Sequence, residues 1–176
     1  MKTNIALIGF MGAGKTTVAR SLATRINRKF VELDSLIELD AGKAITDIFS
    51  QDGEIAFREI EIKVTKDIST GRSMVIACGG GIVLNKINID RLKKESVIVY
   101  LAVSPQALFK RLTDTKNSRP LLNVTNLKST ICELMKYRKQ LYEWAADIMI
   151  DTTEMAVDSV VDTIVNTLSC DESFNL

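Results

Sequence analysis

The chain has 176 residues, and 46% of them are hydrophobic, which is enough for the core of one domain. Lysine and arginine total 23 against 22 acidic residues, so the net charge of +1 excludes a broad basic face for nucleic acid or a membrane surface. Three cysteines without C-x-x-C spacing and the lack of histidine exclude a histidine-bound zinc site and a Ser-His-Asp triad, and they favour a cytoplasmic protein.

No apolar run reaches the roughly 18 residues of a membrane span; instead, short apolar runs alternate with stretches of helical spacing. In chain order, the expected strands cover 5–8, 30–33, 74–78, 97–101 and 148–150. The expected helices cover 18–26, 36–41, a short turn over 46–49 with Thr46 as its N-cap, 57–68, 108–112, 127–142 and 157–168. Strands that alternate with helices predict an α/β fold, in which helices cover both faces of a parallel sheet.

The sequence predicts a single domain over residues 1–170, with no internal repeat and no second domain. The segment 114–125 is polar, contains Pro120 and is longer than most connections, so we expect it to form a mobile lid. The last residues, 171–176, are expected to be a loose tail.

The strongest signal is the segment 9–16, Gly-Phe-Met-Gly-Ala-Gly-Lys-Thr, which fits G-x-x-x-x-G-K-[ST] in full. It lies between an expected strand and an expected helix, where backbone N–H groups can turn toward phosphate oxygens and the helix adds its positive end. In this arrangement Lys15 reaches the β- and γ-phosphates of ATP, and the Thr16 hydroxyl ligates Mg²⁺. A glycine-rich turn with an exposed lysine is the alternative, which the complete motif in its correct context disfavours. The motif does not identify the phosphate acceptor.

Other P-loop proteins carry signals that differ from those of this chain. Regulatory GTPases read guanine with Asn-Lys-x-Asp, whereas the nearest segment here, 85–88, is Asn-Lys-Ile-Asn. Many P-loop enzymes end a second strand in an Asp that holds Mg²⁺, but the expected strand 74–78 runs into the glycines 79–81. Glu32 and Asp34 are therefore the best-placed acids, because ligands bind at the carboxyl edge of an open α/β sheet.

Four features are expected at that edge: Asp34, Arg58, Arg138 and the glycines 79–81. Each has a plain alternative, since Asp34 alone would serve as a helix cap and Arg58 would pair with Glu61 on one helix. Arg138 would be a solvated charge, the glycines a turn, and the nearby phenylalanines core residues. Together, however, two arginines and an acid beside a phosphate loop suit a small acceptor that bears a carboxylate and a hydroxyl.

With these residues in place, the chain closely resembles the shikimate kinases over residues 5 to about 168. The matching segments, in order, are 9–17, 30–34 (Phe-Val-Glu-Leu-Asp), 45–49, 57–61 (Phe-Arg-x-x-Glu), 79–81, 118–122 (Ser-Arg-Pro-Leu-Leu) and 138–142 (Arg-x-x-x-Tyr). The resemblance implies a three-layer α/β/α P-loop kinase fold, with a five-stranded parallel sheet in the order 2-3-1-4-5 and a mobile lid. It also implies transfer of the ATP γ-phosphate to the 3-hydroxyl of shikimate, with Mg²⁺, on the route to chorismate and the aromatic amino acids. We expect a monomer.

The resemblance assigns a role to each matching residue. The implied catalytic residues are Lys15, Asp34 as the base, and Arg119 in the lid. The implied nucleotide-binding residues are Gly12, Ala13, Gly14, Lys15, Thr16, Thr17, Arg111 near adenine, and Arg119. The implied substrate-binding residues, within a region of about 34–62 and beyond it, are Asp34, Phe49, Phe57, Arg58, Gly79, Gly80, Gly81 and Arg138. The implied metal-binding residues are Thr16 and, through a water molecule, Glu32.

Two positions depart from the family pattern. The family usually has Asp where Glu32 stands, and its adenine loop often carries a proline that the segment 151–155 lacks. A kinase for gluconate or a nucleoside monophosphate is one rival prediction, and a nucleotide-binding regulatory module without turnover is another. Cys78, beside the glycine run, is expected to be a buried structural thiol.

Overall fold

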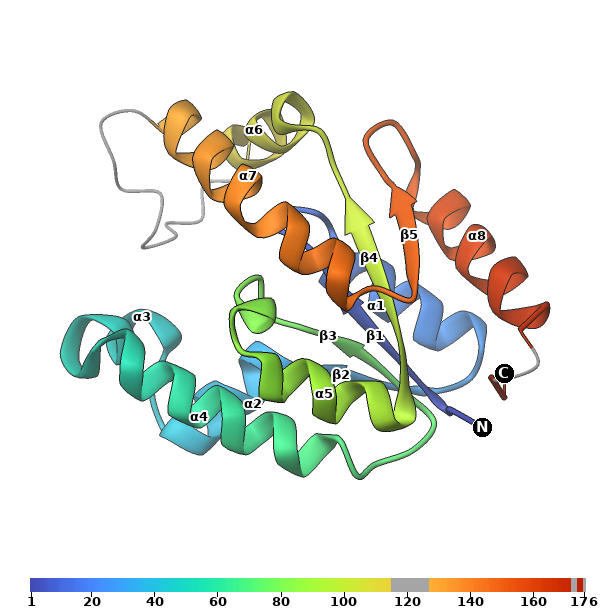
Figure 1. The fold of residues 1–176 in the computed structure, drawn as a ribbon, viewed down its shortest axis with the longest axis horizontal. Coiled ribbons are helices and arrows are strands. Elements are labelled where there is room, and N and C mark those ends of the chain that lie inside the picture. Colours follow the sequence, from blue (N-terminus) through green and yellow to red (C-terminus); the bar gives the residue numbers. More distant parts are fainter. Residues whose placement is uncertain (115–126, 172–173, 176) are drawn as a thin grey trace.

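The computed structural model describes residues 1–114, 127–171 and 174–175, and it contains one five-stranded parallel sheet (Figure 1). Its strands are β1 (Asn4–Ile8), β2 (Lys29–Glu32), β3 (Met74–Ala77), β4 (Ser96–Ala102) and β5 (Ile148–Asp151). They are arranged in the order β2-β3-β1-β4-β5, which confirms the order implied by the resemblance. The strands β1 and β3 are buried along their whole length, as the centre of a sheet covered on both faces requires.

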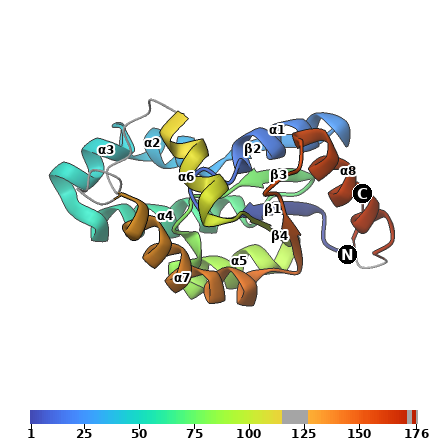
Figure 2. The same cartoon turned by 90° about the horizontal axis from the view of Figure 1, so that it is seen from above.

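Helices form a layer on each side of this sheet (Figure 2). On one side lie α1 (Lys15–Arg25) and α8 (Val157–Ser169), and on the other lie α4 (Gly53–Ile68), α5 (Lys86–Glu95) and α7 (Leu127–Ala145). The shorter elements are α2 (Leu33–Ala41), α3 (Ile45–Asp47), the π-helix η1 (Ile48–Asp52), the 3-10 helix η2 (Ile82–Leu84) and α6 (Pro105–Asp114). The three-layer α/β/α architecture expected from the sequence is thus confirmed.

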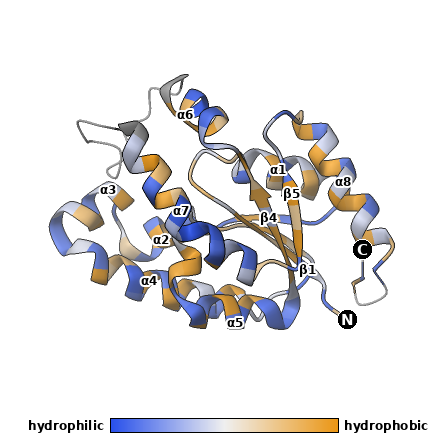
Figure 3. Ribbon diagram, turned by 45° about the horizontal axis from the view of Figure 1, so that its top comes forward, coloured by the Kyte–Doolittle hydropathy of each residue, from blue (hydrophilic) through white to orange (hydrophobic). Residues whose placement is uncertain are grey.

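The core consists of the strands and the helix faces turned toward them, where apolar residues concentrate (Figure 3). In α8, for example, Val160, Val161, Ile164 and Leu168 are buried, as their helical spacing predicts. None of the described helices combines the length and the apolar character needed to cross a membrane.

Three local predictions differ from the structure. The strand expected over 30–33 ends at Glu32, because Leu33 and Asp34 already belong to the first turn of α2. Thr46 is not an N-cap: α3 begins at Ile45, whose N–H donates to Oε1 of Glu38 on the preceding helix at 3.0 Å. Helix α5 was not predicted at all, although two of its buried residues lie three apart, at Ile89 and Leu92.

The end of the chain is packed at Phe174, within the segment expected to be loose. Phe174 is 5% exposed, forms a parallel bridge with Lys2 and lies against the guanidinium of Arg28. Arg28 also donates to the backbone oxygens of Thr3 and Asn175. These contacts hold the two ends of the chain together at the edge of the sheet where β1 begins.

Candidate functional site

A cleft of about 470 Å³ opens at the carboxyl edge of the sheet, within the size range of small-ligand sites. It brings together nearly all the residues that the sequence predicts for the site: Gly12, Gly14, Lys15, Thr16, Thr17, Glu32, Asp34, Phe49, Phe57, Arg58, Gly79, Gly80, Gly81, Arg111 and Arg138. Ala13 does not line it; this residue is buried, and its N–H donates to the carbonyl of Phe10. Arg119 and most of the expected lid lie outside the described residues.

The phosphate-loop side of the cleft is the turn from β1 into α1. Gly14 immediately precedes α1 with φ 91°, a left-handed conformation that a side chain would strain. The Lys15 ammonium is largely buried and donates to the carbonyls of Gly9 and Phe10, both at 3.0 Å. The ammonium is therefore held over the loop, beside the positive end of α1, where both would attract an anion.

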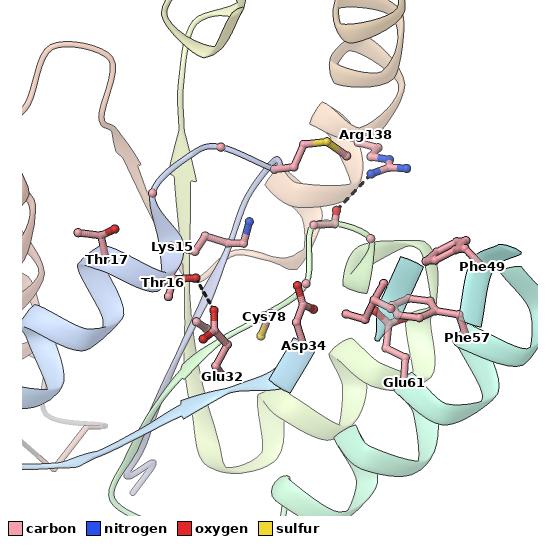
Figure 4. A pocket seen from close by; sticks show the side chains of 18 of the residues that line it. Lys15, Thr16, Thr17, Glu32, Asp34, Phe49, Phe57, Glu61, Cys78 and Arg138 are labelled. Atoms are coloured by element: carbon pink, nitrogen blue, oxygen red, sulfur yellow. Dashed lines mark hydrogen bonds between the residues drawn. The ribbon is translucent and has the colours of Figure 1, made fainter. Parts of the chain in front are cut away.

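Thr16 and Glu32 form a polar pair below this loop. The Thr16 hydroxyl donates to Oε1 of Glu32 at 2.7 Å (Figure 4). Both oxygens belong to the hard class that Mg²⁺ prefers, and Mg²⁺ is usually held by one or two such ligands together with phosphates and water. Among the described residues, no group of three or more acidic or cysteine side chains forms a metal cage. The pair fits an ion held mainly by its nucleotide.

The acceptor side of the cleft begins with Asp34, in the first turn of α2. In Figure 4 its carboxylate lies between Lys15 and the ring of Phe57. A Cβ atom added to Gly79 would lie 2.8 Å from Oδ1 of Asp34. A glycine at position 79 therefore lets this carboxylate pack directly against the backbone after β3.

Arg58 and Glu61, on α4, form an ion pair in the wall of the cleft. Nη1 of Arg58 lies 2.9 Å from Oε2 of Glu61, which is completely buried, and Nη2 lies 3.0 Å from Glu54. Burial raises the pKa of Glu61, while the charge and hydrogen bond of Arg58 oppose that rise and nearby Asp34 adds to it. The pairing with Glu61 predicted as an alternative is real, but it fixes Arg58 at the cleft instead of on the surface.

Arg138 is a buried cation on α7, with only 6% of its surface exposed. Its contacts include a long hydrogen bond from Nη1 to the carbonyl of Gly80, at 3.4 Å, a hydrogen bond with the Tyr142 hydroxyl, and the ring of Phe10, 5.7 Å from its guanidinium carbon. Its Nε has no hydrogen-bond partner, and no carboxylate of the described residues lies within ion-pair distance of it. A buried guanidinium is costly without an anion, so this one is suited to receive an anionic ligand.

The remaining predicted residues frame the two ends of the cleft. Phe49 and Phe57 stack with ring centroids 4.7 Å apart and give the acceptor side an apolar wall. At the other end, Arg111 of α6 donates to the carbonyls of Thr152 and Thr153, at 2.8 and 3.3 Å. Arg111 therefore lies against the segment in which the resemblance places the adenine loop.

The cleft also contains residues that were not predicted as part of the site: Met11, Ile45, Glu61, Ala77 and Cys78. Glu61 carried a usable signal, because it stands four residues after Phe57 and three before Val64 on the apolar face of a predicted helix. An acid in such a position must have a buried partner, and Arg58 is the residue within reach.

Comparison with known proteins gives consistent matches. The shikimate kinase family model matches residues 11–169. The shikimate kinase of Thermodesulfovibrio yellowstonii is 45% identical over 162 residues, 92% of each chain, and that of Pelotomaculum thermopropionicum is 40% identical over 94% of this chain and 95% of its own. Among solved structures, shikimate kinase from Acinetobacter baumannii in complex with shikimate superimposes with a TM-score of 0.92 at 35% identity, covering 98% of this chain and 96% of that one.

Proposed function

This chain belongs to the shikimate kinase family, whose members transfer phosphate from ATP to shikimate. We propose that two sets of residues in its cleft bind these two substrates. The phosphate loop and Lys15 hold the ATP phosphates. Asp34, Arg58, Arg138 and the glycines 79–81 hold shikimate. The two sets line one continuous cleft, which would place the transferred phosphate beside the acceptor hydroxyl.

The observation that carries this proposal is the buried guanidinium of Arg138, which has no carboxylate partner among the described residues. Shikimate is a carboxylic acid, and the planar fork of arginine matches a carboxylate with two parallel hydrogen bonds. The N–H groups of Gly80 and Gly81 line the same cavity and donate to no other group that the structure describes. Together they would supply the remaining donors for the substrate carboxylate and its neighbouring oxygen.

Asp34 would act on the hydroxyl that attacks the phosphate. Its carboxylate is packed against the backbone at Gly79, and it faces Lys15 across the cleft. From this place it would accept a hydrogen bond from the shikimate 3-hydroxyl, aim its oxygen at the γ-phosphate and take up its proton as the new O–P bond forms. Lys15 would neutralise charge on the transferring phosphate oxygens.

We propose that Thr16 and Glu32 hold Mg²⁺, with Thr16 as a direct ligand and Glu32 acting through water. Their side chains supply the hard oxygens required, and the ion would offset the negative charge of the β- and γ-phosphates. We further propose that the protein works as a monomer in the cytoplasm, which sedimentation and cell fractionation can test.

The direct test is calorimetric titration of shikimate into the wild-type protein and the Arg138→Ala variant. We expect the substitution to weaken shikimate binding by about 2–5 kcal/mol, as for removal of one partner of a buried charge pair. Lys139→Ala is the matched control, because Lys139 is the next residue of α7 and its side chain is 67% exposed. An unchanged shikimate Kd in Arg138→Ala would reject the placement of the carboxylate.

The reaction itself is tested by coupled ADP release with shikimate, gluconate and a nucleoside monophosphate as separate acceptors. We expect ADP release when shikimate is the acceptor and none with gluconate or the nucleoside monophosphate. Stabilisation of the protein by ATP without ADP release in saturating shikimate would instead indicate a nucleotide-binding module.

A further inference from the structure

The carbonyl of Gly80 receives hydrogen bonds from two residues of α7 at once. The Tyr142 hydroxyl donates to it, and so does Nη1 of Arg138, at 3.4 Å. The two donors are four residues apart and therefore project from the same face of the helix. One helix face thus holds both the buried guanidinium and the backbone of the glycine run.

Tyr142 is fixed so that its hydroxyl has little freedom to point elsewhere. Its side chain is 1% exposed, and its ring stacks on that of Tyr100 with centroids 5.0 Å apart and planes 16° apart. Burial also raises the pKa of the Tyr142 phenol, although nearby Arg138 opposes this rise, so the hydroxyl keeps its proton at neutral pH. It is therefore a permanent donor to the Gly80 carbonyl.

The direction of this carbonyl determines the direction of a donor on the cleft side. The carbonyl of Gly80 and the N–H of Gly81 belong to one planar trans peptide unit, in which they point in opposite directions. Glycine has no side chain to restrain such a unit, so an external contact must hold it. Gly80 is also packed closely against the phosphate loop, because a Cβ atom on it would lie 3.2 Å from the backbone nitrogen of Met11.

We propose that Tyr142 is a positioning residue for the acceptor: its hydroxyl locks the Gly80–Gly81 peptide so that the Gly81 N–H is presented to the acceptor in the cleft. Tyr142 lies outside the residues proposed above to contact shikimate; its hydroxyl bonds to the Gly80 carbonyl and also to the side chain of Arg138. The inference rests on the proposed binding of shikimate against the glycines 79–81.

The test compares Tyr142→Phe with Tyr100→Phe. Each substitution keeps an aromatic ring in the same stack, but only the first removes hydrogen bonds, those to the Gly80 carbonyl and with Arg138, since the Tyr100 hydroxyl bonds to no group that the structure describes. We expect Tyr142→Phe to raise the shikimate KM and the calorimetric shikimate Kd roughly tenfold, the loss typical of one buried hydrogen bond. The ATP KM should stay within about twofold of wild type, and Tyr100→Phe should leave both KM values unchanged.

Two results would overturn the proposal. One is a Tyr142→Phe variant with the same shikimate Kd as Tyr100→Phe, and the other is a loss of shikimate and ATP affinity in equal proportion, which indicates a structural role alone. The bond is also tested in the wild-type protein by NMR, where the Tyr142 hydroxyl proton should exchange slowly with water and rapid exchange would contradict the proposal. If Arg138→Ala fails to weaken shikimate binding while Tyr142→Phe succeeds, the carboxylate placement is wrong but the positioning role of Tyr142 stands.

Discussion

A Cβ atom on Gly81 would lie 2.5 Å from Nη2 and 2.6 Å from Nη1 of Arg58, closer than non-bonded atoms approach. The guanidinium of Arg58 thus occupies the space where other residues carry a side chain. A glycine at position 81 is therefore required for the Arg58 guanidinium to pack against the backbone there.

Gly81→Ala should displace the Arg58 guanidinium from the cleft and weaken shikimate binding about tenfold or more, with little effect on ATP. Calorimetric titration with each ligand measures both effects. Gly42→Ala is the control: position 42 has φ 68° and open space around it, so this variant should lose stability but keep its shikimate affinity. Equal shikimate affinity in the two variants would contradict the prediction.

Asp34→Asn should leave ATP binding largely intact and lower kcat at least about a hundredfold, because the amide cannot take the proton of the attacking hydroxyl. The coupled ADP-release assay measures kcat. Asp40→Asn provides the control on the same helix, since Asp40 forms an ion pair with Lys63 that is partly exposed. A normal kcat in Asp34→Asn would remove Asp34 from the proposed mechanism.

Glu61 should make stability depend on pH in a defined direction. Burial raises the pKa of Glu61 above its ordinary value of 4.5, so above pH 4.5 the unfolded chain releases this proton while the folded protein retains it. Stability from this group is therefore complete below pH 4.5 and is lost as the pH rises through the folded-state pKa. Glutamine at this position cannot ionise, so the Tm of wild type minus that of Glu61→Gln should fall with rising pH. A constant difference from pH 4 to 8 would show that the pKa is unshifted.

Removal of divalent metal should stop turnover but leave shikimate binding unchanged, because the acceptor-side residues require no metal. Titration of shikimate in EDTA tests the second half of this statement. Glu32→Ala should raise the Mg²⁺ concentration needed for half-maximal turnover, since it removes the carboxylate that accepts the Thr16 hydroxyl at 2.7 Å. Glu38→Ala, on the neighbouring helix, should not change that concentration.

Thiol labelling should modify Cys132 and Cys170 in the native protein and spare Cys78. The first two are exposed, whereas Cys78 is buried and burial raises its pKa to about 12, although nearby Lys15 opposes this rise. A thiol-reactive chromophore should therefore titrate two groups in the native state and all three after unfolding. Rapid reaction of a third thiol in the native protein would show that position 78 is accessible from the cleft.

The sequence was sufficient to predict the parallel sheet, because the central strands of the sheet are continuous apolar runs, as in β1 and β4. Such runs are buried only in a sheet that helices cover on both faces. The sequence was insufficient to predict α5, because this helix mixes four basic residues with only a few apolar ones. Its stability comes from contacts with α4 and β4. Such tertiary contacts are invisible in local spacing. The predicted end of β2 was one residue too late, because Leu33 is apolar and buried although it begins α2, and an apolar residue after a strand does not mark where the strand ends.

The sequence predicted which residues share the cleft where a motif fixed the backbone and where parallel strands deliver their ends to one edge. It missed Glu61, although the helical spacing of Glu61 carried a usable signal, and it missed Tyr142, for which the sequence carried none. Glu61 acts through its buried contact with Arg58, and Tyr142 through a backbone carbonyl more than sixty residues away in sequence. The second contact depends on packing between elements that sequence spacing does not relate, whereas the first joins two residues of α4 and only its burial was unforeseen.

The bridge between Lys2 and Phe174 has a practical consequence for engineering this protein (Figure 1). The two ends of the chain meet beside the start of β1, whereas the cleft opens where β1 finishes. Fusion partners or immobilising tags attached at either end would therefore leave the substrate entrance clear. The same neighbourhood makes the chain a suitable candidate for circular permutation, with its old ends joined by a short flexible linker.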